Sequence, residues 1–238
     1  MKGFILALQF LTRLPTPRVH ADQADFARSM RWFPATGLVV GLTVAGAAWA
    51  GARLDPWTGA LGGLVAWVGI TGALHLDGLS DLADASGAAH KDRERMLAVM
   101  ADPHIGSFGV VTIVLQLAAK LVLLHALIDA GQFVPLILTP FAARIGPLVW
   151  ARWLPPLHNG LAARFASVVR IQDVAGWLAL LAASALLAPA ILAAPLLIAG
   201  WWLWLKGRIG GISGDCHGAG IELVETGLLL ALLIASHL

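Results

Sequence analysis

The sequence predicts an all-α integral membrane protein, a polytopic helical bundle of about seven transmembrane helices with a cytoplasmic N-terminus. Three observations carry this prediction. The 238 residues are 58% hydrophobic and 13% charged, with a mean hydropathy of +0.80, unlike soluble domains. Seven apolar stretches follow one another along the chain. The basic residues between them fall almost entirely on one side of the predicted membrane. We therefore expect a single transmembrane domain over residues 1–238.

The N-terminal apolar run, Phe4 to Leu11, is too short to cross a bilayer and lacks a small-residue cleavage site, so it predicts a retained interfacial segment. The seven longer stretches cover residues 33–52, 57–76, 106–128, 132–150, 174–188, 191–205 and 221–238. Pro189 and Pro195 interrupt the fifth and sixth stretches. Residues 174–205 are too long for one straight crossing, so they form either two short spans or a broken helix.

Charge placement supports this topology. With a cytoplasmic N-terminus, one face receives thirteen basic residues and the other receives only Arg53, as the positive-inside rule requires. The same count places residues 77–105 and 206–222 together on the cytoplasmic face, where we expect the active-site loops. The net charge of +2 is too small to indicate nucleic acid as a partner, and the single cysteine, Cys216, excludes an internal disulfide.

The first acidic motif is His75-Leu-Asp-Gly-Leu-Ser-Asp-Leu-Ala-Asp84. Asp77, Asp81 and Asp84 stand at i, i+4 and i+7, so on a helix they share one face. The alternative is a solvated helix end, but no Lys or Arg interrupts these acids. A divalent cation with phosphate co-ligands would relieve their repulsion. Gly78 lets a substrate or metal approach the backbone. His75 faces nearly the opposite way, which is more typical of a residue that supports a ligand or packs in the core, but it stays a candidate for substrate binding.

The second acidic motif is Gly210-Gly-Ile-Ser-Gly-Asp-Cys-His-Gly-Ala-Gly220, followed by Glu222 and Glu225. So many glycines disfavour a lipid-facing helix and favour a loop whose amides turn toward an anion, with Gly214 and Asp215 at its centre. The alternative is a glycine-rich hinge with interfacial acids. Acids at membrane depth are costly unless they are paired or bound to metal.

Several other polar residues are candidates for substrate binding. Lys91 and Arg95 could hold phosphate groups, bind anionic lipid headgroups, or only follow the positive-inside rule, and the same holds for Arg13. Asp102 belongs to the same loop as Lys91. Arg144 and Lys120 lie within predicted spans, where a charge indicates function by default, although Arg144 could snorkel to the interface.

These motifs resemble the cobalamin synthase family, the adenosylcobinamide-GDP ribazoletransferases. The resemblance covers Phe10 to Pro17, Phe33-Pro34 with Gly37 and Gly41, the His75 to Asp84 motif, and Gly210 to Glu222. It implies a bacterial inner-membrane enzyme that requires Mg²⁺ and acts at the cytoplasmic face. The expected substrates are adenosylcobinamide-GDP and α-ribazole or its 5′-phosphate, and the products are adenosylcobalamin or its 5′-phosphate and GMP. The sequence is also compatible with a homo-oligomer in the lipid bilayer.

The family's acidic positions fall on Asp77, Asp81, Asp84, Asp215 and Glu222. We expect the four aspartates to hold one or two Mg²⁺ ions against the pyrophosphate, and Asp84 or Glu222 to take the proton of the attacking hydroxyl. Around Asp102 the sequence departs from the family pattern, with Ala101, Pro103 and His104 where basic or small polar residues are common.

Two other functions remain open at this point. A CDP-alcohol phosphotransferase also lines membrane helices with spaced aspartates, but Ser80 and Asp81 stand where that family has Ala-Arg. A divalent-cation transporter would place its acids near the bilayer midplane on broken helices, whereas most acids here gather at one face.

Overall fold

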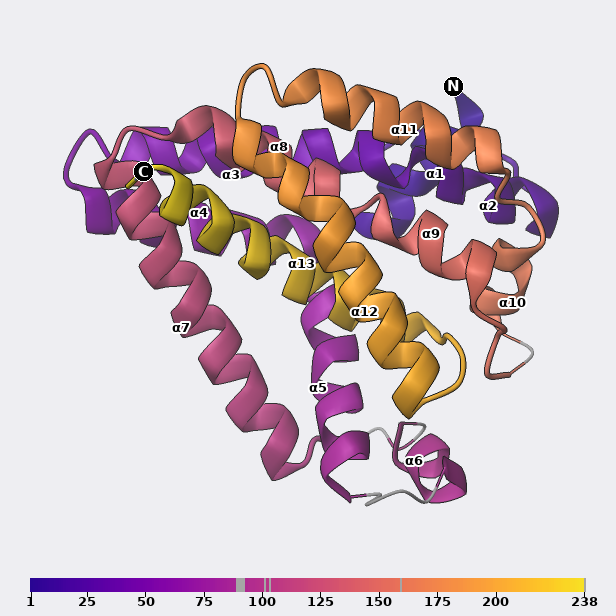
Figure 1. Cartoon of the computed structure of the whole chain (residues 1–238). Coiled ribbons are helices and arrows are strands. Elements are labelled where there is room, and N and C mark those ends of the chain that lie inside the picture. The colour runs from indigo at the N-terminus through magenta and orange to yellow at the C-terminus, as the bar shows by residue number, and fades with distance from the viewer. Residues whose placement is uncertain (89–92, 101, 103, 159, 238) are drawn as a thin grey trace.

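The computed structural model describes residues 1–88, 93–100, 102, 104–158 and 160–237, and every regular element in these ranges is a helix. Figure 1 shows their arrangement. The elements are α1 (Lys2–Leu11), α2 (Gln23–Ser29), η1 (Met30–Trp32), α3 (Phe33–Gly51), α4 (Pro56–Thr71), α5 (Leu74–Ala88), α6 (Arg93–Met100), α7 (Ser107–Asp129), α8 (Phe133–Ala143), α9 (Gly146–Trp153), α10 (Leu161–Ala166), α11 (Ile171–Ser184), η2 (Pro189–Ala193), α12 (Ala194–Arg208) and α13 (Gly214–Ala235).

Several of these helices are long and apolar enough to cross a membrane. Five described segments pass this criterion: Gln23–Gly51, Ser107–Asp129, Phe133–Trp153, Pro189–Arg208 and Gly214–Ala235. A sixth is reached only if α4 and α5, which are bent by 85°, count as one broken span. The all-helical membrane fold is thus confirmed, but a count of seven is not, because α11 has only 14 residues and a span needs roughly 20.

The connections gather at two ends of the bundle. The α3–α4 and α7–α8 turns and the C-terminus lie together at the left of Figure 1, while α6 and α10 lie toward the opposite end. Residues 174–205 form two helices, α11 and η2–α12, joined by a turn at 185–188, and the chain reverses direction between them in Figure 1. Residues 174–205 are therefore two separate helices, although α11, with 14 residues, is shorter than the span that was expected there.

Close helix packing depends on glycine between α3 and α8. A Cβ at Gly41 would lie 2.1 Å from the Ile137 carbonyl oxygen, and one at Gly37 would lie 2.4 Å from that of Pro140. Only a residue without a side chain permits this approach, which is how small residues bring membrane helices together.

The bend between α4 and α5 positions the first acidic motif. Helix α4 begins at Asp55, whose carboxylate accepts the amide hydrogens of Trp57 and Thr58, with Pro56 at the first position. It ends in two left-handed residues, Gly72 with φ 60° and Ala73 with φ 58°. A left-handed alanine is uncommon, and this pair turns the chain sharply so that α5 leaves the direction of α4.

The two segments expected as loops are largely helical. Residues 77–88 belong to α5, 93–100 form α6, and the glycine-rich motif is helical from Gly214 onward. The helical spacing of the first motif was expected, but the loop expectation for the second motif fails because it treated glycine as a helix breaker. Gly218 and Gly220 sit where α13 touches its neighbours, and this packing offsets their low helix propensity.

Candidate active site

The two acidic motifs meet where α5 crosses α13. A Cβ at Gly78 would lie 2.8 Å from the Asp215 Cα, and a Cβ at Gly218 would lie 3.2 Å from the His75 Cα. The helices therefore touch backbone to backbone at the point where each carries its Asp-Gly or Gly-Asp pair. This confirms the expectation, drawn from charge placement, that the two distant motifs come together on one face.

Three carboxylates remain accessible at this crossing. Asp77 is exposed, and Asp81 and Asp215 are half-buried. Asp81 lies within electrostatic range of Asp77, Asp215 and Asp84. The Asp215 carboxylate faces the Ser213 hydroxyl at 3.3 Å, and that serine caps α13 by accepting the Cys216 amide hydrogen. Carboxylates gathered in this way repel each other, which favours an added cation.

Asp84 is oriented differently from the other three aspartates. Its side chain is buried, and its two oxygens accept the amide hydrogens of Gly106 at 2.7 Å and Gly109 at 2.9 Å. These amides are among the free donors at the start of α7. Asp84 thus caps a neighbouring helix, and a carboxylate engaged in this way is poorly placed to take a proton from a substrate.

A cavity of about 230 Å³ opens beside the accessible carboxylates. Its polar wall includes Asp77, Gly78, Gly214 and Asp215. The rest of the lining comes from α1, α3, α9, α10 and the pocket-facing side of α13: Phe10, Leu11, Phe33, Pro147, Ala162, Phe165 and Ile221. The site therefore combines an acidic mouth with an aromatic and aliphatic interior.

Two histidines lie between these walls. His75 and His217 both line the cavity and are 3% and 8% exposed. None of their four ring nitrogens has a hydrogen-bond partner in the described part of the chain. Buried polar atoms normally find a partner, so these nitrogens are unsatisfied polar groups in the described structure. The sequence left His75 as either a packing residue or a substrate-binding candidate, and the structure places it in the cavity wall.

Glu222 and Arg144 lie outside this cavity, in a buried ion-pair network. Lys120 Nζ lies 2.7 Å from Glu222 and 2.6 Å from Glu225, and Arg144 pairs with Glu225 at 2.8 Å. Gln116 also donates to Glu222 at 2.9 Å. Two cations and two anions balance at membrane depth, where unpaired charge is costly. The structure thus gives Glu222 and Arg144 structural partners and brings neither to the proposed substrate pocket.

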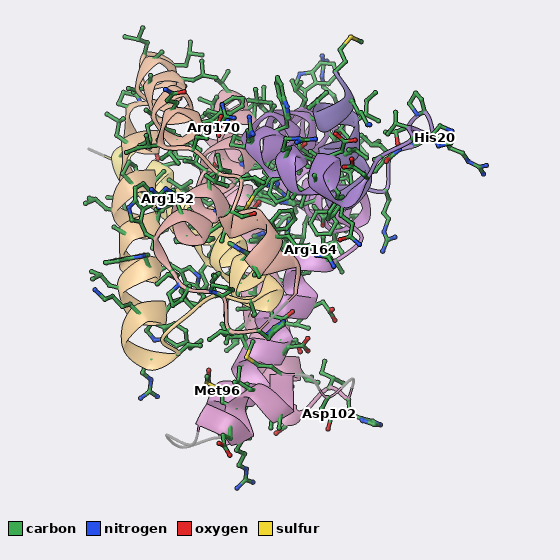
Figure 2. The ribbon with its side chains drawn as sticks, turned by 90° about the vertical axis from the view of Figure 1, so that its right-hand side faces the viewer. His20, Met96, Asp102, Arg152, Arg164 and Arg170 are labelled. Carbon is green, nitrogen blue, oxygen red and sulfur yellow. The ribbon has the colours of Figure 1, made fainter. Side chains whose placement is uncertain are left out.

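The remaining candidates for substrate binding are dispersed. Arg13 is exposed and packs against the α4–α5 bend, where a Cβ at Gly72 would lie 2.2 Å from its Nε. Arg95 is exposed on α6. Asp102 accepts hydrogen bonds from the amide and ring of His104, and it lies at the lower end of the molecule in Figure 2. Lys91 is outside the described residues.

The donor set fits Mg²⁺ only in the company of a substrate. Within the described ranges, no three His, Cys, Asp or Glu side chains converge closely enough to hold a metal by themselves. Mg²⁺ usually takes one or two carboxylates and completes its shell with water and substrate phosphates. Asp77, Asp81 and Asp215 supply hard oxygen ligands of this kind beside an open cavity.

Comparison with known proteins places this site in a family. The model of the family described as cobalamin-5-phosphate synthase matches residues 3–233. The chain belongs to this family. The resemblance drawn from the acidic and glycine motifs is therefore confirmed over nearly the whole length.

Similar members of the cobalamin-5-phosphate synthase family carry the name adenosylcobinamide-GDP ribazoletransferase. The protein from Novosphingobium aromaticivorans is 67% identical over 98% of this chain and 97% of its own. Those from Thiobacillus denitrificans and Brevibacillus brevis are 54% and 34% identical, covering 97% and 98% of this chain and 94% and 98% of their own. No solved structure matches this fold.

Sequence reasoning missed the cavity and His217. The histidine stands two residues after Asp215 within the glycine motif, and its place beside an acidic residue was the available signal. Phe10 and Phe33 belong to segments that carry the family resemblance, but nothing local assigned them to a site, because isolated phenylalanines in an apolar chain are typical of lipid-facing or core positions. The same holds for Phe165.

Proposed function

We propose that this chain is an adenosylcobinamide-GDP ribazoletransferase, a membrane enzyme that joins adenosylcobinamide-GDP to α-ribazole or its 5′-phosphate. The products are adenosylcobalamin or its 5′-phosphate and GMP. Family membership supports the reaction, and one structural observation supports the position of the active site. Asp77 and Asp215, from motifs more than a hundred residues apart in sequence, line the same cavity. A diphosphate substrate with its cation requires acidic groups gathered at one open position.

The reaction breaks a phosphoanhydride bond and forms a phosphate ester bond. A ribose hydroxyl oxygen of α-ribazole forms a bond to the phosphorus that carries cobinamide. The bond from this phosphorus to the bridging oxygen breaks, and GMP leaves with that oxygen. The hydroxyl proton needs an acceptor. Asp77 and Asp215 line the cavity, whereas Asp84 and Glu222 do not, so we assign this role to the Asp77–Asp215 pair.

Mg²⁺ is the cofactor that we propose for this site. Asp77, Asp81 and Asp215 would hold it, and a cation there supplies charge neutralisation on the bridging and leaving oxygens. The chain's own contribution is positional. The backbone contact of α5 with α13 fixes the distance between the two acidic motifs, and the aromatic wall excludes water from one side of the cavity.

We also propose a bacterial inner-membrane location with seven crossings, a cytoplasmic N-terminus and the active site at the cytoplasmic face. This topology adds α11 to the longer segments and treats the α4–α5 bend as the end of a crossing. Thirteen of the basic residues then fall on the cytoplasmic side. Figure 2 labels three of them, Arg152, Arg164 and Arg170.

A cation transporter finds less support. The acids that lie deepest in the bundle, Glu222 and Glu225, are already paired with Lys120 and Arg144. A permeation site would need such carboxylates to be free for the passing ion. A CDP-alcohol phosphotransferase is disfavoured because the matching family model is that of cobalamin-5-phosphate synthase.

The test is reconstitution with defined substrates. Purified protein is incubated with adenosylcobinamide-GDP, α-ribazole and Mg²⁺, and the products are separated by chromatography. We expect equal amounts of adenosylcobalamin and GMP. An absence of both products from folded protein, or GMP release without cobalamin, would contradict the proposed activity.

A further inference from the structure

We propose that the cavity lined by Phe10, Phe33, Phe165, His75 and His217 binds the aromatic base of the nucleoside substrate. This inference rests on the proposed function, which supplies a nucleoside with a planar bicyclic base. We call this group of five residues the base pocket. Its position next to Asp77 and Asp215 would place the attached ribose at the acidic mouth.

The size of the cavity limits which part of a substrate can enter it. At about 230 Å³ it is smaller than the roughly 300–1,000 Å³ typical of pockets for drug-sized molecules. A corrin macrocycle does not fit such a space, whereas a bicyclic base does. The large corrinoid must therefore approach from the open, acidic side.

The aromatic wall suits a flat ring. Phe10 and Phe33 are stacked with centroids 5.9 Å apart, and Phe165 packs edge-on against Phe33 at 5.7 Å. These rings come from α1, α3 and α10, and their mutual packing holds them in fixed positions. Planar aromatic groups gain both from burial on such surfaces and from stacked or edge-to-face contacts.

The two histidines supply the polar contact that a base needs. A neutral imidazole carries one N–H donor and one acceptor, and all four nitrogens of His75 and His217 are without partners in the described structure. A benzimidazole-type base presents one acceptor nitrogen and an otherwise apolar edge. Guanine presents several donors and acceptors, which this mostly apolar wall would leave unpaired at a substantial cost.

The order of residues along α13 gives the ligand a direction. Gly214 and Asp215, then His217 and Gly218, then Ile221 line the cavity at helical spacing. Moving inward from the mouth, a ligand meets first a carboxylate, then an imidazole, then an aliphatic group. A nucleoside has the same sequence: a ribose hydroxyl, a ring nitrogen and an apolar ring edge.

The test is equilibrium binding of α-ribazole to the purified full chain in lipid nanodiscs, followed by calorimetry. Adenosylcobinamide-GDP is left out, so binding is measured without turnover. We expect His217→Phe and Phe165→Leu each to weaken binding by about tenfold or more. Phe26→Leu is the matched control, because Phe26 packs against Phe10 and Phe165 without lining the cavity, and it should bind as the wild type does.

Turnover and photolabelling complete the test. In turnover, the two pocket variants should raise the KM for α-ribazole and leave that for adenosylcobinamide-GDP unchanged. A photoreactive benzimidazole riboside should label α1, α3, α5, α10 or α13 of the wild type, a result that does not depend on any variant folding. Equal binding by wild type and both folded variants, or labelling confined to other helices, would overturn the inference.

These measurements separate the two proposals. If the wild type turns over and the variants have the same KM for α-ribazole as the wild type, the base pocket is contradicted and the transferase function is supported. If the wild type binds α-ribazole specifically but releases no GMP, and the variants lose this binding, the base pocket is supported and the transferase function is contradicted.

Discussion

Gly78 and Asp215 lie in direct contact, with no room for a methyl group between them. A Cβ at residue 78 would come within 2.8 Å of the Asp215 Cα and 2.9 Å of its carbonyl oxygen. Because the obstacle is backbone, it cannot move aside as a flexible side chain would. This contact ties the spacing of Asp77 and Asp81 on α5 to that of Asp215 on α13.

Replacing Gly78 with Ala should therefore separate the two helices. We expect a loss of about 1–3 kcal/mol in stability from overpacking and a fall in product formation of at least about tenfold, because the acidic groups move apart. Thermal unfolding and GMP release measure the two effects. Gly69→Ala is the control, since nothing lies within 4 Å of its Cβ position. Equal behaviour of the two variants would argue against a tight crossing.

Asp84 should contribute mainly to the stability of the folded protein and not to the chemical step. In Asp84→Asn, only one side-chain oxygen remains to accept the amide hydrogens of Gly106 and Gly109, so one buried donor loses its partner at a cost of about 1–2 kcal/mol. We expect a lower unfolding temperature and activity that survives at low temperature. Asp77→Asn provides the contrast, because Asp77 is exposed, and should lose activity without losing stability. An Asp84→Asn variant of normal stability without activity would instead indicate a direct role in the reaction.

The buried charges around Lys120 should contribute to stability as a coupled group. Lys120→Met removes the partner of Glu222 and one partner of Glu225, which should cost about 3–5 kcal/mol and reduce the yield of folded protein. Adding Glu222→Gln to Lys120→Met should restore part of the stability, because the unpaired charge is removed. Melting curves of the single and double variants measure this coupling. Additive losses would mean that the pair does not interact as described.

Topology can be read from accessibility to a membrane-impermeant maleimide in a Cys216→Ser background. Asp129 ends α7 at the α7–α8 turn, so Asp129→Cys should react from the outside of intact cells. Asp102→Cys, beyond α6, should react only after the membrane is opened. Labelling of both positions from the same side would contradict the proposed orientation.

The meeting of the two acidic motifs was predictable from sequence, because the placement of basic residues puts both on one face. The helical spacing of Asp77, Asp81 and Asp84 was also readable, and α5 contains all three. Their separate orientations were not. Asp84 turns to cap α7, which depends on where another helix begins, and no local pattern contains that information.

The buried ion-pair network and the base pocket could not be predicted from the sequence, for a related reason. Lys120 and Arg144 were recognisable as intramembrane charges, but naming Glu222 and Glu225 as their partners requires the rotation of three helices about their axes. The base pocket draws on α1, α3, α5, α10 and α13, so its phenylalanines look like ordinary core residues until the chain is folded. The glycines led to a wrong prediction of loops, because contacts such as that of Gly218 with His75 form between helices and cannot be read from the local sequence.

The central claim is that Asp81, within electrostatic range of Asp77 and Asp215, helps to hold a cation for the substrate diphosphate. The most direct measurement is the Mg²⁺ concentration that gives half-maximal GMP release, compared between the wild type and Asp81→Asn of equal thermal stability. We predict no release in the presence of EDTA, recovery on adding Mg²⁺, and a requirement at least about tenfold higher in the variant. Release that persists in EDTA, or an unchanged Mg²⁺ requirement in Asp81→Asn, would contradict the claim.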